Sequence, residues 1–274
     1  MNRVIVITGA GGVLCSMFSR ELAKDGDKIA LLDINEDAAK KAADEICAAG
    51  GTAKAYRTDV LDRGSIAQTH ERVLADFGAC DILINGAGGN SPKCTAVHEE
   101  YTAGDESVKD VLTFFNLDEE GFRSVFDLNL LGSLMPAQEF SRDMLGRKGC
   151  SILNISSMNA YRPLTKIPAY SAAKAAVTNF TEWLAVYFAK TGIRVNAIAP
   201  GFFVTNQNRS LLFNDDGTPT ARTEKILRST PMGRFGDPAE LIGAVRFLLD
   251  ADAAGFVTGV VIPVDGGFSA YSGV

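Results

Sequence analysis

Residues 4–14 read VIVITGAGGVL, and this stretch sets the fold expected for the whole chain. The β-branched run at 4–7 is typical of a buried parallel strand. A glycine-rich turn follows, and a helical pattern of apolar residues then continues to about Lys24. Strand, glycine turn and helix in this order form the first half of a dinucleotide-binding unit, where backbone N–H groups and the helix N-terminus meet a pyrophosphate. A tight strand-to-helix turn without a ligand is the alternative.

The alternation of strand and helix continues along the chain. Further strands are expected at 29–32, 53–56, 81–84, 151–155, 193–198 and 257–262, and helices at 36–49, 64–77, 122–144, 169–189 and 238–249. Because no linker or internal repeat interrupts this pattern, it predicts an α/β fold. We expect a Rossmann-type, doubly wound parallel sheet of about seven strands in a single domain, residues 1–274. The irregular stretches 91–118 and 202–232 are expected to be loops on the substrate side.

Composition excludes several classes of function. The net charge of −6, without a basic run, argues against a nucleic-acid-binding surface. No apolar run is long enough for a membrane span, and the N-terminal residues lack the pattern of a signal peptide. The five cysteines form no C-x-x-C motif, so we expect reduced thiols and a cytoplasmic protein. With two histidines and no clustered ligand spacing, no metal site is expected.

An acidic residue, Asp33, ends the second expected strand. It lies roughly 20 residues past the glycine turn, where an acid can accept hydrogen bonds from the adenosine ribose hydroxyls. It would also repel a 2′-phosphate, and residues 34–37 contain no arginine, so NAD is favoured over NADP. Capping of the next helix is the alternative role, but Asn35 can serve it as well.

A candidate catalytic pair lies at the start of the helix expected over 169–189. Tyr170 and Lys174 are spaced i and i+4, so their side chains share one helix face. A neighbouring ammonium stabilises the phenolate and lowers the tyrosine pKa from about 10 toward the working pH. Taken alone, the pair is weak evidence, because a partly buried tyrosine beside a solvated lysine is common in helices.

These motifs, with Asn85-Gly86-Ala87-Gly88 after the fourth strand and Ser157 after the fifth, closely resemble the short-chain dehydrogenase/reductase family over essentially the whole chain. The resemblance implies four catalytic residues: Asn129, Ser157, Tyr170 and Lys174. It implies a cofactor site formed by Gly9, Gly12, Val13, Leu14, Asp33, Ile34, Asp59, Val60, Asn85, Gly86, Ala87, Tyr170, Lys174, Pro200, Gly201 and Phe203. In this family Tyr170 would transfer the proton and Ser157 would donate a hydrogen bond to the substrate oxygen. Lys174 would lower the pKa of Tyr170 and hold the nicotinamide ribose. Asn129 would hold a water, or else mark a helix kink.

The chain departs from the family pattern in two places. Val13 and Cys15 occupy the later glycine positions of the cofactor turn, and we expect Cys15 to hold its helix slightly further from the strand. Gly86 replaces the second asparagine of the Asn-Asn-Ala-Gly element, which removes a side chain but no backbone group.

Within the family, residues 88–92, 156–166 and 201–209 resemble the D-mannonate oxidoreductase (fructuronate reductase) branch. A sugar acid needs hydrogen bonds to its hydroxyl groups and a cation for its carboxylate. The candidates are Asn90, Ser157, Asn159, Arg162, Asn206 and Arg209, with Lys166 as an alternative cation. These loop residues could instead bond to backbone or contact another subunit.

The expected function is therefore NAD-dependent interconversion of D-fructuronate and D-mannonate, and the family resemblance implies a homotetramer. A polyol, gluconate or other ketone reductase on the same scaffold stays open. A non-catalytic NAD-binding regulator is the alternative from another class, but the intact Asn, Ser, Tyr and Lys set argues against it.

Overall fold

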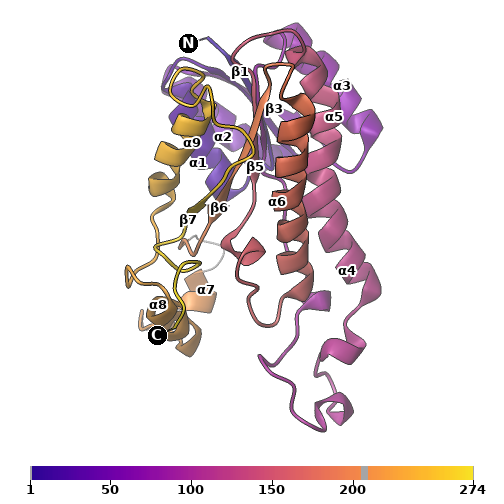
Figure 1. Cartoon of the computed structure of the whole chain (residues 1–274), viewed down its shortest axis with the longest axis vertical. Coiled ribbons are helices and arrows are strands. Elements are labelled where there is room, and N and C mark those ends of the chain that lie inside the picture. The colour runs from indigo at the N-terminus through magenta and orange to yellow at the C-terminus, as the bar shows by residue number, and fades with distance from the viewer. Residues whose placement is uncertain (1, 205–208, 274) are drawn as a thin grey trace.

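A computed structural model describes residues 2–204 and 209–273. It contains a parallel sheet of seven strands in the order β3-β2-β1-β4-β5-β6-β7 (Figure 1). The strands are β1 Val4–Thr8, β2 Lys28–Asp33, β3 Thr52–Arg57, β4 Ile82–Asn85, β5 Ser151–Ile155, β6 Arg194–Pro200 and β7 Val261–Val264. The strand order reverses between β1 and β4, and sheets of this kind bind ligands beyond the strand ends at that point. The predicted doubly wound α/β fold is confirmed.

Helices cover both faces of the sheet. The helices of the described residues, on the sheet faces and beyond the strand ends, are α1 Val13–Ala23, α2 Glu36–Ala48, α3 Arg63–Asp76, α4 Glu119–Phe126, α5 Gly132–Met144, α6 Pro168–Phe188, α7 Arg209–Leu212, α8 Ala221–Ser229 and α9 Ile242–Leu249. In Figure 1, α1, α2 and α9 lie on one side of the sheet and α3, α5 and α6 on the other. Side-chain caps begin several of these helices: Asn35, for example, accepts a hydrogen bond from the N–H of Ala38 at 3.2 Å.

The core follows from the alternation of side chains along each strand. In β1, Ile5 and Ile7 pack against the layer of α1, α2 and α9, whereas Val4 and Val6 pack against the opposite layer. Because both faces are covered, the strand is a continuous apolar run. Burying each such side chain contributes about 1.5–3 kcal/mol.

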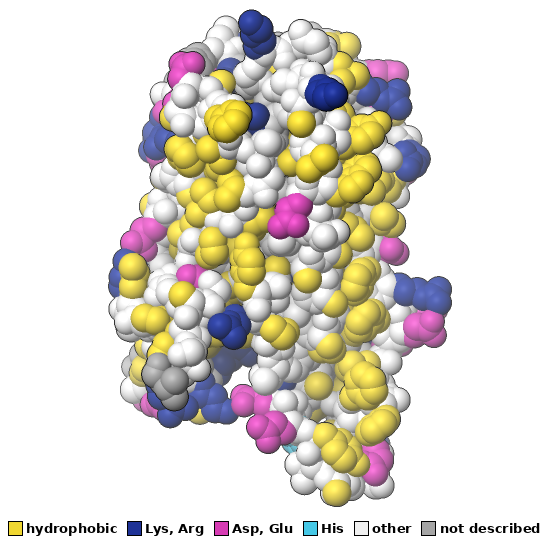
Figure 2. All heavy atoms as spheres, viewed as in Figure 1, with side chains coloured by type: hydrophobic (Ala, Val, Ile, Leu, Met, Phe, Trp, Pro, Cys, Tyr) yellow, Lys and Arg dark blue, Asp and Glu magenta, His cyan; other side chains and the backbone are white. Residues whose placement is uncertain are grey.

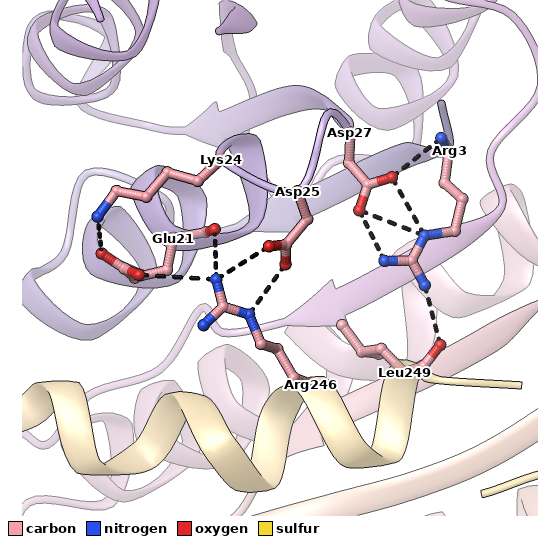
Figure 3. A network of polar contacts seen from close by, with 7 residues as sticks. All are labelled: Arg3, Glu21, Lys24, Asp25, Asp27, Arg246 and Leu249. Carbon is pink, nitrogen blue, oxygen red and sulfur yellow. Dashed lines mark hydrogen bonds and ion pairs between the residues drawn. The ribbon is translucent and has the colours of Figure 1, made fainter. Parts of the chain in front are cut away.

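Ion pairs fasten the amino-terminal edge of the sheet, opposite to the strand ends where ligands bind (Figure 3). The guanidinium of Arg3 binds the buried carboxylate of Asp27, with 2.6 Å between Nη2 and Oδ2, and donates to the Leu249 carbonyl at 3.0 Å. On α9, Arg246 binds Asp25 at 2.9 Å and the Glu21 carbonyl at 2.9 Å. These contacts hold α1 and α9 against the sheet at its base.

Two expected elements have different bounds. The helix predicted at 122–144 begins at Glu119 and is interrupted by a π-helix, Asp127–Leu131. The last strand begins at Val261, not at 257 as predicted. Gly259 has a φ of 79°, a left-handed conformation that does not occur within a strand, and the Thr258 hydroxyl takes the N–H of Val195 at 3.1 Å.

The two stretches predicted as loops have different outcomes. Residues 91–118 contain only the short 3-10 turns Pro92–Cys94, Asp105–Ser107 and Phe114–Asn116. Residues 202–232, by contrast, include α7 and α8, which the sequence pattern missed. Helix α8 is short and polar, and it buries only Thr223 and Ile226. No helix in the described ranges has the length and apolar character needed to cross a membrane. All five cysteines are free thiols.

Candidate active site

A cleft of about 400 Å³ opens at the carboxyl ends of β1, β4, β5 and β6. It is lined by Gly9, Gly12, Val13, Leu14, Cys15, Gly86, Gly88, Gly89, Ile155, Ser156, Ser157, Tyr170, Lys174, Pro200, Gly201, Phe202 and Phe203. We call it the central cleft. Residues expected separately on the glycine turn, on three strand ends and on α6 therefore meet in one place, as the topology of the sheet requires.

The glycine turn is built to receive an anion. Gly12 is the N-cap of α1, and no side chain caps this helix, so its first-turn N–H groups keep their donor capacity. Gly9 has a φ of 63°, and a Cβ there would lie 2.8 Å from the backbone of Ala87. Only glycine fits this position. An uncapped helix end beside a narrow turn suits the pyrophosphate of a dinucleotide.

Asp33 is held at the end of β2, close to this turn. One carboxylate oxygen accepts a hydrogen bond from the N–H of Gly11 at 2.8 Å, and the other accepts from the N–H of Asn35 at 2.8 Å. Asn35, not Asp33, caps α2. The carboxylate is thus fixed in orientation, and each oxygen retains a lone pair for a further donor.

Other expected cofactor residues lie outside the lining of the central cleft. Ile34 is 61% exposed beside Asp33. Asp59 accepts a hydrogen bond from the N–H of Leu61 at 2.9 Å, and its neighbour Val60 is buried. Both positions follow strand ends on the β2 and β3 side of the sheet.

The end of β4 is fastened to its neighbours. Asn85 is buried and donates to the side chain of Asn154 at 2.9 Å, while its own Oδ1 has no partner among the described residues. The hydroxyl of Thr8 accepts from the N–H groups of Gly86 and Ala87, at 3.1 and 3.3 Å. These bonds set the position of the turn that follows β4.

Cys15 and Gly86, the two departures from the family pattern, are in direct contact. A Cβ built on Gly86 would collide with the Cys15 sulfur and would lie 2.9 Å from the Thr8 carbonyl oxygen. The thiol thus occupies the space left by the missing side chain. Burial raises the pKa of the Cys15 thiol to about 12, so the sulfur is neutral at physiological pH.

Three of the four expected catalytic residues line the central cleft together. The Nζ of Lys174 donates to the Ile155 carbonyl at 2.8 Å and lies 5.6 Å from the centre of the Tyr170 ring. The Ser157 hydroxyl lies near enough to the Tyr170 phenol to favour its phenolate and lower its pKa. The Ser157 hydroxyl also accepts from the N–H of Asn159 at 3.2 Å, which fixes its orientation. Lys174 is 5% exposed, and its burial lowers its pKa to about 8.

The sequence predicted a lowered pKa for Tyr170, but the protein groups around this phenol raise its pKa instead. Burial raises the pKa of this phenol, and the nearby Ser157 hydroxyl only partly opposes that shift. Desolvation of the phenolate therefore sets the direction of the shift, and Lys174, whose Nζ lies over the ring, does not reverse it.

Asn129 lies in the π-helix, and its side chain borders the same space over Gly88 as the Nζ of Lys174. Its amide nitrogen donates to the carbonyls of Val125 at 2.7 Å and Gly89 at 2.8 Å, whereas its buried Oδ1 has no partner among the described residues. A Cβ on Gly88 would lie 2.6 Å from this oxygen and 3.1 Å from the Nζ of Lys174. Glycine at this position leaves space between the two side chains.

The expected substrate residues are more scattered, and of those described only Ser157 lines the central cleft. Asn90 is exposed and donates to Thr95 at 3.0 Å. Arg162 is exposed and donates to the Ser269 carbonyl at 3.1 Å, so it holds the C-terminal segment. Asn159 is buried, and its Oδ1 has no partner among the described residues. Arg209 is exposed on α7, with its guanidinium 5.3 Å from the centre of the Phe213 ring. Asn206 lies outside the described residues.

Ile155, Ser156 and Phe202 line the cleft but were not identified from the sequence. A usable signal existed for all three. Each lies at the carboxyl end of β5 or β6 or within two residues of it, on the ligand side of the sheet, and Ser156 directly precedes Ser157.

Comparisons with known proteins give a consistent result. A family model described as short chain dehydrogenase matches residues 3–215. An uncharacterized oxidoreductase of Haemophilus influenzae is 60% identical over 273 residues, covering 100% of this chain and 95% of that protein. The uncharacterized oxidoreductase UxuB of Bacillus subtilis is 52% identical, with 100% and 97% coverage. A crystal structure of a candidate D-mannonate oxidoreductase from Haemophilus, with bound NAD, has a TM-score of 0.96 at 59% identity and covers 100% of this chain and 97% of that one.

Proposed function

The chain belongs to the short-chain dehydrogenase family and uses NAD, and on that premise we propose that it interconverts D-fructuronate and D-mannonate. The observation that carries the substrate is the full-length similarity, at 59% identity, to a candidate D-mannonate oxidoreductase. The reaction type is supported by the convergence of Ser157, Tyr170 and Lys174 beside the glycine turn in one cleft.

The cofactor would extend along the carboxyl edge of the sheet. The uncapped N-terminus of α1 and the turn at Gly9 and Gly12 would hold the pyrophosphate. Asp33 would accept hydrogen bonds from the adenosine ribose. The adenine would be flanked by Ile34, Asp59 and Val60. The turn after β4 (85–87) and residues Pro200, Gly201 and Phe203 would lie along the nicotinamide half. Bound NAD supplies the hydride acceptor at the nicotinamide C4.

Tyr170 carries the proton in this proposal. Because burial raises its pKa, the hydroxyl is neutral and can donate to the carbonyl oxygen of the substrate during reduction. Ser157 donates a second hydrogen bond to the same oxygen, where negative charge develops. Lys174 is protonated below about pH 8, and its charge stabilises the phenolate that forms on Tyr170.

Asn129 would complete the proton path as a positioning residue. Its Oδ1, which has no partner in the described part of the chain, and the Nζ of Lys174 both border the space over Gly88. A buried polar oxygen without a protein partner commonly binds an ordered water. A water there would connect Lys174 to solvent.

The loops beyond the cleft would supply substrate specificity. Asn159 follows Ser157 by two residues, and its buried Oδ1 has no partner among the described residues, so a substrate hydroxyl could satisfy it. Asn90, Asn206 and Arg209 are the further candidates. Arg162 is a weaker one, because its guanidinium already binds the C-terminal segment.

We also propose a homotetramer in the cytoplasm. Trp183 and Tyr187 stack on α6 with 5.1 Å between their ring centres, and both are more than half exposed. Figure 2 shows hydrophobic side chains gathered along the face formed by α5 and α6. An apolar stripe of this kind usually marks a contact with another protein chain. The free thiols fit a reducing compartment.

The test is NADH oxidation across a panel of D-fructuronate, 5-ketogluconate and simple ketones. Turnover confined to D-fructuronate supports the proposal. Preference for 5-ketogluconate or a simple ketone would favour the broader reductase reading. NADH binding without turnover of any of them would favour a non-catalytic regulator.

A further inference from the structure

A salt bridge joins the two loop segments that flank the central cleft. The Nζ of Lys225, on α8, lies 2.9 Å from both carboxylate oxygens of Glu99, in the stretch 91–118. The two residues are 126 positions apart in the sequence. Both side chains are partly exposed, so the contact lies at the surface.

Both segments leave the rim of the central cleft. Gly88 and Gly89 line the cleft just before the first segment, and residues 200–203 line it just before the second. Figure 1 shows the first segment and α8 at the same end of the molecule, beyond the carboxyl ends of the strands. The bridge between Glu99 and Lys225 therefore joins the two segments beyond the carboxyl edge of the sheet, at the end of the molecule where the central cleft opens.

The first segment is also bound to the chain just before the catalytic helix. Cys94 belongs to the buried cluster against which Tyr170 packs, and the N–H of Ala96 donates to the Lys166 carbonyl at 2.7 Å. Glu99 and Lys166 then line one cavity of about 280 Å³ beside Pro168, the first residue of α6. Glu99 is thus held close to the helix turn that carries Tyr170.

Positive charge gathers around Glu99. Lys225 binds it directly, and Lys166 and Arg222 add to the positive potential that lowers the pKa of its carboxyl. Lys166 has a φ of 72°, a left-handed conformation that is strained for a residue with a side chain. Such strain is concentrated at functional positions. Lys225 is thus in direct contact with the carboxylate, and Lys166 lines the same cavity as Glu99.

We propose that Glu99 and Lys225 form a latch across the mouth of the central cleft, which an anionic substrate opens by placing its own carboxylate against Lys225, Arg222 and Lys166. The carboxylate step rests on the proposed sugar-acid function. A sugar acid replaces the ion pair that it breaks, whereas a neutral sugar breaks it without a substitute. The latch would therefore select sugar acids over neutral sugars.

The kinetic test compares D-fructuronate with D-fructose, which has a hydroxymethyl group in place of the carboxylate. Lys225→Gln should lower the KM for D-fructose about fivefold, the scale of an exposed ion pair, and leave the KM for D-fructuronate near the wild-type value, because neither sugar then has an ion pair to break. Glu99→Gln should lower the KM for D-fructuronate, because the internal competitor is gone. Glu100→Gln, the matched control at the next residue, should match the wild type for both sugars. Equal behaviour of Glu99→Gln and Glu100→Gln, or an unchanged preference for D-fructuronate over D-fructose in Lys225→Gln, would overturn the carboxylate step.

Hydrogen exchange without any substrate tests the latch separately. Glu99→Gln and Lys225→Gln should each speed amide exchange in both residues 97–108 and α8, while Glu100→Gln should not. Unchanged exchange in the two variants would overturn the latch itself. A wild-type enzyme that does not turn over D-fructuronate would instead overturn the sugar-acid assignment and the carboxylate step with it, and the exchange result would still decide the latch.

Discussion

The sulfur of Cys15 occupies the space that a side chain on Gly86 would need. Both residues depart from the family pattern, with a cysteine in place of a glycine at the start of α1 and a glycine in place of an asparagine after β4. The cysteine thiol fills the space that the absent asparagine side chain would need. The expectation that Cys15 displaces its helix treated the two positions separately. In the structure they form one packed unit beneath the central cleft.

Gly86→Asn should therefore disrupt the cofactor site, whereas the double variant Cys15→Gly with Gly86→Asn should recover part of the loss, because the close approach to the Thr8 carbonyl oxygen remains. Overpacking a filled site costs about 1–3 kcal/mol, so the single variant should weaken NADH binding about tenfold or more. NADH titration followed by fluorescence measures both variants. Equal NADH affinity of the single and double variants would show that the contact has no bearing on the cofactor.

Tyr170→Phe should abolish turnover but leave NADH binding intact. Loss of a general acid typically lowers kcat by roughly 100-fold to 10,000-fold, and the ring itself is retained for packing. Tyr161→Phe, which removes an exposed phenol hydroxyl that donates to the Val261 carbonyl, is the control. Turnover near the wild-type rate in Tyr170→Phe would rule out the proposed proton transfer.

Asp33→Asn should reduce the preference for NAD over NADP. The amide keeps one acceptor oxygen but removes the charge that binds the ribose and repels a 2′-phosphate. A hydrogen bond to a charged group contributes about 1.5–3 kcal/mol, so the ratio of kcat/KM values for the two cofactors should fall at least about tenfold. Asp37→Asn, in the first turn of α2, serves as the control. An unchanged ratio in Asp33→Asn would refute the ribose role.

Ketone reduction should lose efficiency as the pH rises through about 8. Burial lowers the pKa of Lys174 to about 8, so its stabilising charge is present below that pH and is lost above it. The profile of kcat/KM reports groups of the free enzyme and is the quantity to measure. Lys174→Arg should remove the decline, because arginine stays charged. The same decline in both proteins would assign it to another group.

Replacing Trp183 by glutamate should dissociate the oligomer. The exposed Trp183 and Tyr187 stack on α6, and a charge buried in an interface there would be uncompensated. Light scattering after size-exclusion chromatography gives the mass. The matched variant Phe256→Glu changes an exposed aromatic elsewhere and should leave the mass unchanged. A monomeric wild type would contradict the proposed tetramer directly.

The sheet could be predicted from sequence because buried parallel strands are continuous apolar runs with glycine turns after them. Residues such as Ile5 and Val6 carry that signal locally. The last strand was misplaced because Val257, Thr258 and Val260 are as β-branched as the strand itself, and only the left-handed Gly259 between them shows that the strand begins later. Helix α8 was missed because a short polar helix has no apolar stripe.

The candidate site was predictable where a motif is contiguous and unpredictable where it depends on distant contacts. The spacing of Tyr170 and Lys174 predicted that they share one helix face. It did not predict how deeply Tyr170 is buried, and this burial raises its pKa. The contacts between Cys15 and Gly86, and between Glu99 and Lys225, join residues far apart in the sequence. A single sequence contains no pattern that pairs them.

The most direct measurement is the oxidation of D-mannonate by the purified enzyme with NAD, with the product identified by chromatography. The account predicts stoichiometric formation of NADH and D-fructuronate, and the reverse reaction from D-fructuronate and NADH. Absence of D-fructuronate, in a protein that binds NADH and reduces a different ketone, would contradict the proposed substrate.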